Sequence, residues 1–163
     1  MRVEQQIGFV LHRYPYRETS LLVELFTPEH GRLGAVAKGA RRMTSEWRST
    51  LNPFQALLLG WSGKGELATL THAEATTLPS ELAGAGLFCG LYLNELLMRL
   101  LPRDDAHAEL FALYRATLAV LPDESAREAA LRIFEKRLLQ ALGYGLVLDR
   151  TVNGDAIDAD GAY

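Results

Sequence analysis

The sequence predicts an α+β protein in which a small five-stranded β-barrel precedes a set of helices. Short β-rich runs separated by glycine-containing turns fill the first 80 residues. From Pro79 onward, apolar residues recur instead at helical spacing. The 163 residues are 48% apolar and 23% charged, the balance of an ordinary globular protein. A fold of this size hides roughly 68–70% of the surface of its unfolded chain, so a substantial core is expected.

Five segments have the character of strands, and they cover residues 6–12, 20–27, 32–38, 54–61 and 66–75. Pro28-Glu29-His30-Gly31 makes the turn after the second segment, with Gly31 supplying a positive φ. Residues 62–65 form a hairpin turn before the last segment. Glycines inside the strands mark bends, which favours a partly open barrel of the OB-fold type. A five-stranded sandwich is the other arrangement that fits.

The connection between the third and fourth strands is long, running from Gly39 to Pro53. Connections longer than about 12 residues are usually functional or disordered. This one combines three arginines with Trp47. The indole is expected either to offer a flat stacking surface or to anchor the loop in the core.

The first predicted helix covers about residues 87–101 and ends before Pro102. Only Asn94, Glu95 and Arg99 are strongly polar in it, so we expect it to be buried on most sides. Asn94 and Glu95 either contact a partner or form a buried polar bond that braces the helix against the barrel. Glu95 can also pair with Arg99 at i, i+4.

Two further helices follow. The second runs from about Asp105 to Leu121, and its apolar stripe is Leu110, Phe111, Tyr114, Leu118 and Leu121. Ser125-Ala126-Arg127-Glu128 fits a capping box at the start of the third. Its apolar stripe is Leu131, Phe134, Leu138 and Leu142, and Gly143 is placed as its C-terminal glycine.

The expected organisation has three parts. Residues 1–79 form an OB-fold-like nucleic-acid-binding domain, and residues 80–148 form a helical domain. Residues 149–163 hold four aspartates and little apolar content, so they are expected to be an acidic and poorly packed tail.

Charge is unevenly distributed behind the net value of −3. Residues 1–80 carry nine Lys or Arg and seven Asp or Glu, whereas residues 81–163 carry eight and thirteen. Between residues 32 and 48 there is a single acidic residue, Glu46, and five basic residues, namely Arg32, Lys38, Arg41, Arg42 and Arg48. Such a patch indicates nucleic-acid binding, although a solvated loop is the alternative.

No catalytic or metal-binding arrangement is visible in the sequence. Cys89 is the single cysteine and lies in an apolar helix, where a buried and inert thiol is expected. The histidines share no metal-ligand spacing, and Gly65 stands where a P-loop needs Ser or Thr after its lysine. The chain also lacks an apolar run of about 20 residues and a signal peptide. We therefore expect a cytoplasmic protein that is not an enzyme and holds neither cofactor nor metal.

Several segments together resemble the bacterial DNA repair protein family RecO. In the first half these are Phe9-Val10-Leu11, Arg17-Glu18-Thr19-Ser20-Leu21-Leu22, Leu25-Phe26-Thr27 with Glu29 and Gly31, Ala37-Lys38-Gly39-Ala40-Arg41-Arg42, Leu51-Asn52-Pro53-Phe54, and Gly65-Glu66-Leu67 with Ala73-Glu74. In the second half they are Gly90-Leu91-Tyr92-Leu93-Asn94-Glu95-Leu96-Leu97, Leu131-Arg132 with Phe134-Glu135, and Leu142-Gly143-Tyr144-Gly145. The resemblance covers about residues 7–148, and its motifs follow the family order.

The resemblance implies an N-terminal OB-fold, a helical domain and a further C-terminal portion. It implies a recombination mediator that binds single- and double-stranded DNA independently of sequence and anneals complementary strands. The implied partners are RecR and the C-terminal tail of single-strand-binding protein, and the implied result is loading of the RecA recombinase. The implied location is the bacterial cytoplasm, at the nucleoid.

The sequence departs from the family pattern in two respects. Family chains usually continue well past Gly145, so we expect this chain to be a fragment or a truncated product. Some members carry a four-cysteine zinc site, but Thr151 stands near where a cysteine is often found and no cysteine follows Cys89. Zinc is therefore not expected.

Two binding sites are predicted. DNA is expected on the patch around the long connection, at Arg32, Lys38, Arg41, Arg42, Trp47 and Arg48. The alternative is a protein-interaction module whose basic loop binds an acidic protein.

The acidic, apolar tail of single-strand-binding protein needs an apolar pocket beside a cation. We place this second site on the third helix, at Arg127, Leu131, Arg132, Phe134 and Leu138. Arg132 is the favoured partner of the terminal carboxylate; alternatively it only pairs with Glu128 or Glu135.

Overall fold

The computed structural model describes residues 2–63, 67–77 and 82–145, together with Arg150, Gly154 and Ile157. Two expectations therefore fall largely outside the described residues. They are the tip of the hairpin turn at 62–65 and the acidic tail at 149–163.

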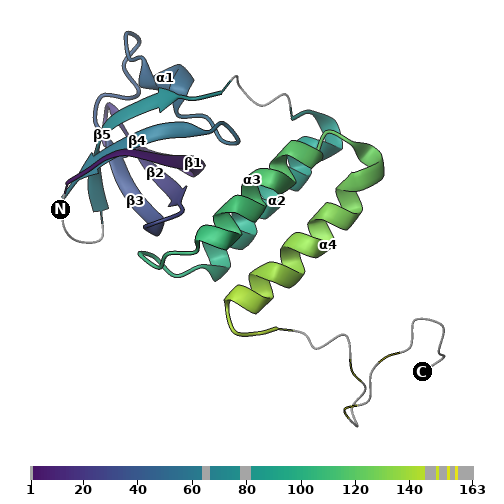
Figure 1. Ribbon diagram of the computed structural model, residues 1–163. Coiled ribbons are helices and arrows are strands. Elements are labelled where there is room, and N and C mark those ends of the chain that lie inside the picture. The colour runs from purple at the N-terminus through teal and green to yellow at the C-terminus, as the bar shows by residue number, and fades with distance from the viewer. Residues whose placement is uncertain are drawn as a thin grey trace.

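The N-terminal half is a closed barrel with the strand order β1-β2-β3-β5-β4 (Figure 1). The strands are β1 (Arg2–Tyr16), β2 (Ser20–Thr27), β3 (Gly31–Ala37), β4 (Leu57–Ser62) and β5 (Leu67–Ala75). β3 and β5 pair in parallel, whereas the other neighbours are antiparallel. The single closed sheet confirms the OB-like barrel and excludes the two-sheet sandwich.

The barrel interior has its own apolar core. The residues that fill it are Val10, Val23, Leu25, Leu33, Ala35, Ala37, Ala40, Leu51, Leu57, Leu59, Trp61 and Leu70. The turn from β2 to β3 depends on Gly31, whose φ is +61° as the sequence predicted. A Cβ at this position would lie 1.7 Å from the carbonyl oxygen of Asp105, so only glycine fits where the helical half meets the barrel.

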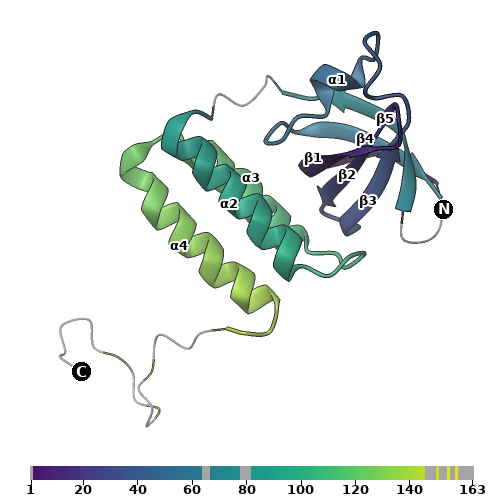
Figure 2. The same ribbon diagram turned by 180° about the vertical axis from the view of Figure 1, so that it is seen from behind.

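Three long helices follow, α2 (Gly84–Leu100), α3 (Ala108–Val120) and α4 (Glu124–Ala141). α2 and α3 lie against the barrel, and α4 packs on their outer side (Figures 1 and 2). A four-residue helix, α1 (Trp47–Thr50), interrupts the long connection after β3. The predicted apolar stripe of α3 is buried, and so are Leu131, Phe134 and Leu138 of α4.

The ends of α4 are closed by hydrogen bonds. Its N-cap is Asp123, not the predicted Ser125, because the Asp123 carboxylate accepts the backbone N–H of Ser125 at 2.9 Å and the helix begins two residues earlier than a Ser125 cap implies. At the other end, Gly143 has a φ of +82°, which confirms the predicted C-terminal glycine. Its N–H donates to Gln140, and that of Tyr144 donates to Leu139, the pairing of a Schellman motif.

The prediction that α2 is buried on most sides is wrong. Its buried stripe is Gly86, Gly90, Leu93, Asn94 and Leu97, and Leu96 and Met98 are partly buried against the same core. Other apolar residues of α2 are exposed, namely Leu87, Phe88, Leu91, Tyr92 and Leu100, and the Tyr92 hydroxyl donates to Glu135 of α4 at 2.8 Å. Cys89 is half-buried against the core and not fully buried as predicted.

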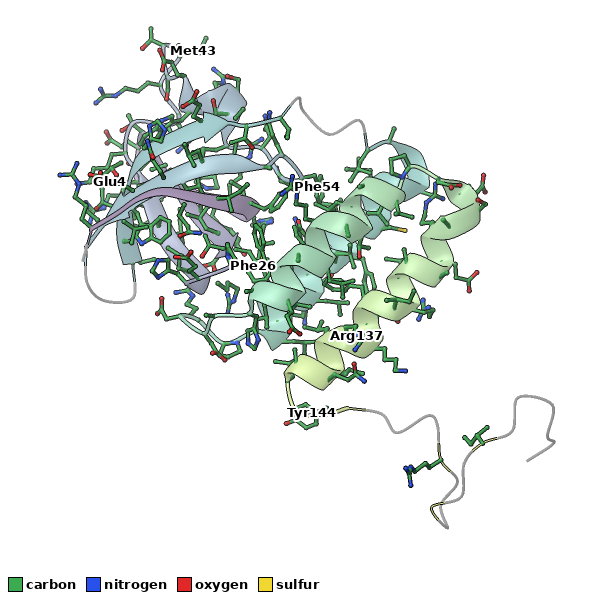
Figure 3. All side chains as sticks on the ribbon, viewed as in Figure 1. Glu4, Phe26, Met43, Phe54, Arg137 and Tyr144 are labelled. Atoms are coloured by element: carbon green, nitrogen blue, oxygen red, sulfur yellow. The ribbon has the colours of Figure 1, made fainter. Side chains whose placement is uncertain are left out.

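A second core joins the barrel to the helices. Phe9 and Phe26 of the barrel each contact the rings of Phe111 and Tyr114 of α3, with centroids 5.2–5.9 Å apart. Figure 3 shows Phe26 and Phe54 at this junction. A Cβ at Gly90 would lie 3.0 Å from the Phe54 ring, so the glycine lets α2 approach the barrel closely. The shared core fixes the helices relative to the barrel.

Candidate nucleic-acid interface

The loop after β3 and the start of α1 carry four of the predicted DNA-binding residues on the surface. Lys38, Arg41, Arg42 and Arg48 are all exposed. This region lies apart from α2, α3 and α4 in both views (Figures 1 and 2). Met43 is exposed at the outer tip of the loop, as Figure 3 shows. The helical half therefore leaves these cations open to a ligand.

Hydrogen bonds hold the loop against the turn between β1 and β2. The backbone N–H of Arg41 donates to the carbonyl of Thr19 at 2.9 Å. The Arg41 guanidinium donates to the carbonyls of Arg17 and Glu18, both at 3.2 Å. Each of these acceptors is a neutral backbone carbonyl, so the positive charge of Arg41 is oriented without being neutralised.

Two further arginines belong to the same surface and were missed in the sequence. Arg13 lies near the end of β1, and its Nη1 donates to the carbonyl of Leu51 at 3.2 Å. Arg17 lies in the turn after β1, with its guanidinium carbon 5.2 Å from the centre of the Tyr16 ring. We call Arg13, Arg17, Lys38, Arg41, Arg42 and Arg48 together the basic surface.

Strand register explains why Arg13 and Arg17 join this surface. β2 pairs antiparallel with both β1 and β3, and Leu21 lies opposite Ala37. The turn that precedes β2 therefore meets the residues that follow β3. If the first three predicted strands are assumed to pair antiparallel, Arg13 and Arg17 are expected near the loop after the third strand. This expectation also depends on the strand register, which the sequence alone does not give.

Arg32, which the sequence analysis expected at the DNA site, lies outside the basic surface. Its guanidinium donates to the buried Glu24 carboxylate at 3.0 Å and to the carbonyl of Leu101 at 3.0 Å. Arg103 also pairs with Glu24. A half-buried cation held between a carboxylate and the end of α2 ties the barrel to the helical half, so it has little freedom to meet a phosphate.

Trp47 is half-buried and packs against the barrel core. Of the two roles considered for the indole, this geometry agrees with anchoring the loop. The flat face needed to stack on a base is partly covered by the protein, so we leave Trp47 out of the basic surface.

A pocket of about 510 Å³ lies within the basic surface. Arg13, Arg41 and Arg48 line it, together with the apolar side chains of Pro15, Leu21 and Met43. Arg48 Nη1 lies 3.0 Å from the sulfur of Met43. Among the described residues, none of the three guanidinium groups forms an ion pair with a carboxylate.

The residues expected to bind the tail of single-strand-binding protein do not form an open pocket. Leu131, Phe134 and Leu138 are 9%, 0% and 1% exposed, because this stripe of α4 is the face that packs on the core. Arg127 donates to the carbonyl of Leu121 at 2.8 Å and so caps the end of α3. Arg132 is exposed and pairs with the half-buried Glu135 at 2.6 Å, and this pairing was the alternative for this residue; Glu135 also accepts the Tyr92 hydroxyl of α2.

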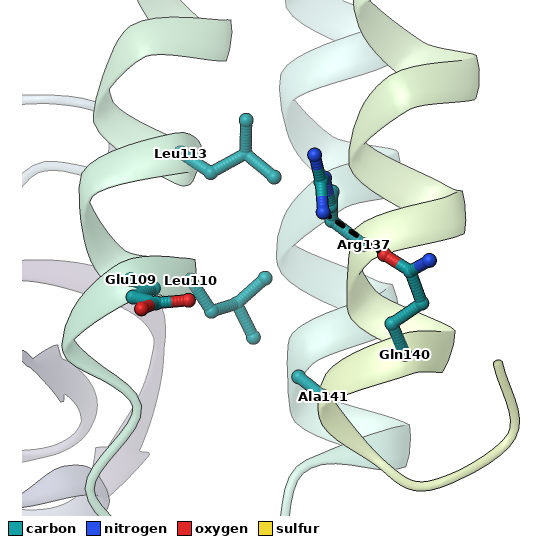
Figure 4. Close-up of a pocket in the computed structure, with 6 residues that line it drawn as sticks. All are labelled: Glu109, Leu110, Leu113, Arg137, Gln140 and Ala141. Carbon is teal, nitrogen blue, oxygen red and sulfur yellow. Dashed lines mark hydrogen bonds between the residues drawn. The ribbon is translucent and has the colours of Figure 1, made fainter.

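A different pocket of about 440 Å³ opens between α3 and α4 (Figure 4). Leu110 and Leu113 of α3 point toward α4, where Arg137, Gln140 and Ala141 face them. Arg137 Nη1 donates to the side-chain oxygen of Gln140 at 3.3 Å, which holds the cation at the rim. Glu109 adds one negative charge to the lining. This pocket combines an apolar floor with a positioned guanidinium.

The described part of the chain offers no sign of metal chemistry or of a membrane span. No three His, Cys, Asp or Glu side chains come together there as a metal site. No helix among the described residues has the length and apolar character needed to cross a bilayer.

Comparison with known proteins shows one family over almost the whole chain. The profile described as "Recombination protein O N terminal" matches residues 1–79, and "Recombination protein O C terminal" matches residues 83–163. The DNA repair protein RecO of Dechloromonas aromatica is 52% identical over 99% of this chain and 68% of its own length. The RecO proteins of Methylococcus capsulatus and Nitrosococcus oceani are 52% and 54% identical, over 99% and 91% of this chain and 67% and 60% of their own.

The chain belongs to the RecO family, whose curated members are named DNA repair proteins. It spans about two thirds of the length of the relatives named above.

Proposed function

We propose that this protein is a non-enzymatic DNA-binding mediator of recombination that holds DNA on the basic surface of its barrel. The observation that carries the proposal is that six cations converge at one end of an OB-like barrel. Cations of this density neutralise phosphates and release their counterions, which gives binding without sequence preference. The basic surface presents no helix that would enter a groove and read base edges.

Single-stranded DNA is the expected preferred ligand, and duplex DNA binds through the same phosphate contacts. Barrels of the OB type bind single strands along a basic groove. Simultaneous binding of two strands would lower their mutual repulsion, which is the physical basis for the annealing that we propose. The proposed role also includes cooperation with RecR in loading RecA onto coated single strands.

A salt titration tests the proposal. Anisotropy of a labelled single-stranded oligonucleotide of mixed sequence, and of its duplex, is measured at several salt concentrations. Binding that weakens steeply with salt and is equal for unrelated sequences supports the proposal. Displacement of bound DNA is then tried with an acidic peptide of equal charge. If the peptide binds more tightly than the oligonucleotide, the basic surface is a protein-interaction site.

The pocket between α3 and α4 favours a second proposed function, docking of the acidic, apolar tail of single-strand-binding protein. Leu110 and Leu113 offer apolar contact, and Arg137 can take the terminal carboxylate in a charge-assisted hydrogen bond. A labelled tail peptide with a free carboxylate is compared with the same peptide amidated at its end. Equal affinity of the two peptides would exclude a carboxylate contact and with it this assignment.

A further inference from the structure

The pocket in the basic surface has two kinds of lining, and plain phosphate binding explains only one of them. Three guanidinium groups, those of Arg13, Arg41 and Arg48, are oriented by neutral acceptors and keep their charge. Pro15, Leu21 and Met43 add apolar surface between them. A volume of about 510 Å³ is within the range of about 300–1,000 Å³ typical of small-molecule sites.

We propose that this pocket holds one unstacked nucleotide of a single DNA strand. Its phosphate lies among the three guanidinium groups, and its base covers the apolar side chains of Pro15, Leu21 and Met43. The inference rests on the proposed DNA binding and makes it more specific. It adds Arg13 as a phosphate contact and Met43 as the principal base contact.

The position of Met43 supports this assignment. Its side chain is 84% exposed at the tip of the loop, and its sulfur is fixed beside Arg48 Nη1 at 3.0 Å. A thioether is polarisable and adapts its shape to an aromatic partner. A base laid against Met43 would also meet the delocalised plane of the neighbouring guanidinium, a favourable contact for any of the four bases.

Strand preference follows from this arrangement. A base paired and stacked in a duplex cannot enter the pocket without breaking its pairing and its stacking, which disfavours its entry. A single strand has no pairing to break. The pocket therefore favours single strands over duplex, while the surrounding cations serve both.

The test separates the base from the phosphate. Affinities are measured by anisotropy for an oligothymidine, for an oligomer of the same length made of abasic units, and for a duplex. The Met43→Ser variant should bind the oligothymidine roughly threefold to tenfold more weakly, less than an aromatic platform would lose. It should bind the abasic oligomer and the duplex as the parent protein does. Ile133→Ser, which alters an exposed apolar side chain on α4, is the matched control and should change none of the three.

Arg13→Gln tests the phosphate half. This variant should bind the oligothymidine and the abasic oligomer more weakly, by the same factor, and its slope of log affinity against log salt should be smaller by about 0.7. Equal loss of affinity for intact and abasic strands in Met43→Ser, or no loss for either, would overturn the base pocket. An unchanged salt slope in Arg13→Gln would overturn the phosphate contact. If the parent protein binds no DNA at all, the proposed function itself fails.

Discussion

Asn94 of α2 donates a hydrogen bond from its Nδ2 to the backbone carbonyl of Leu11 in β1, at 2.8 Å. Leu11 lies at an irregularity of β1, where the register to β2 shifts between Val10 and His12. Such a bulge leaves its extra residue out of the ladder, so the Leu11 carbonyl is free to meet the helix. The other end of the Asn94 amide accepts the Tyr114 hydroxyl at 2.6 Å. One buried amide thus links a strand, α2 and α3, which confirms the structural alternative for Asn94.

Loss of this amide should be costly. Asn94→Leu keeps the size of the side chain but leaves the Leu11 carbonyl and the Tyr114 hydroxyl buried without their partner. We expect the free energy of unfolding to fall by at least about 2 kcal/mol, since each unsatisfied buried group costs about 1–3 kcal/mol. Urea unfolding measures the change. Glu95→Gln, which only weakens an exposed pair with Arg99, should cost no more than about 0.5 kcal/mol and serves as the control. Equal stability of the two variants would contradict the bracing role.

Arg32→Ala should separate stability from DNA binding. The guanidinium makes charged hydrogen bonds to Glu24 and to the end of α2, and such bonds are worth about 1.5–3 kcal/mol. We expect a loss of that order in unfolding experiments and an unchanged salt slope of DNA binding. A slope reduced by about 0.7 in the folded variant would return Arg32 to the DNA site.

The pattern of apolar residues was sufficient to predict the elements, because barrel strands and amphipathic helices each leave a periodic trace. The pattern could not show whether an apolar stripe packs against the core or is open to a partner. Leu131, Phe134 and Leu138 have the spacing of a docking face and of a core face alike, and the structure uses them for the core. The apolar side of α2 shows the converse, since Phe88 is 72% exposed. Which face is covered depends on where neighbouring elements lie, and this is a property of tertiary packing.

The same limit applies to the candidate DNA site. The cluster from Lys38 to Arg48 is local in sequence and therefore visible. Arg13 and Arg17 reach it only through the pairing of β1, β2 and β3. Arg32 is close to the cluster in sequence, but it forms an ion pair with Glu24 on the neighbouring strand β2. Ion pairing across strands cannot be seen from composition.

The cap of α4 predicts a dependence of stability on pH. Hydrogen bonds from Ser125 hold the pKa of Asp123 below its ordinary value. A carboxylate with a depressed pKa stabilises the fold above its unfolded pKa of about 3.9, and this contribution is lost as the pH falls through the folded value. Thermal midpoints of the parent and of Asp123→Asn should therefore differ at neutral pH, begin to converge as the pH falls below about 4, and meet only below the folded pKa. A difference that persists unchanged at low pH would contradict the charged cap.

Arg132 and Arg137, two of the three arginines of α4, provide a matched comparison for peptide docking. Arg137→Ala should lower the affinity for a labelled tail peptide roughly tenfold, because a charged hydrogen bond worth about 1.5–3 kcal/mol is lost. Arg132→Ala removes only the ion pair with Glu135, away from the pocket between α3 and α4, and should bind the peptide like the parent. The opposite result, with Arg132 critical and Arg137 neutral, would move the site to the outer side of α4.

The most direct test of the central claim is the salt dependence of single-stranded DNA binding by the variant Arg41→Glu with Arg42→Glu. If the basic surface holds the DNA backbone, the variant binds more weakly and its log–log salt slope falls by about 0.7 for each lost phosphate contact, or about 1.4 in all. An unchanged affinity and slope in the folded double variant would place the DNA site elsewhere on the molecule.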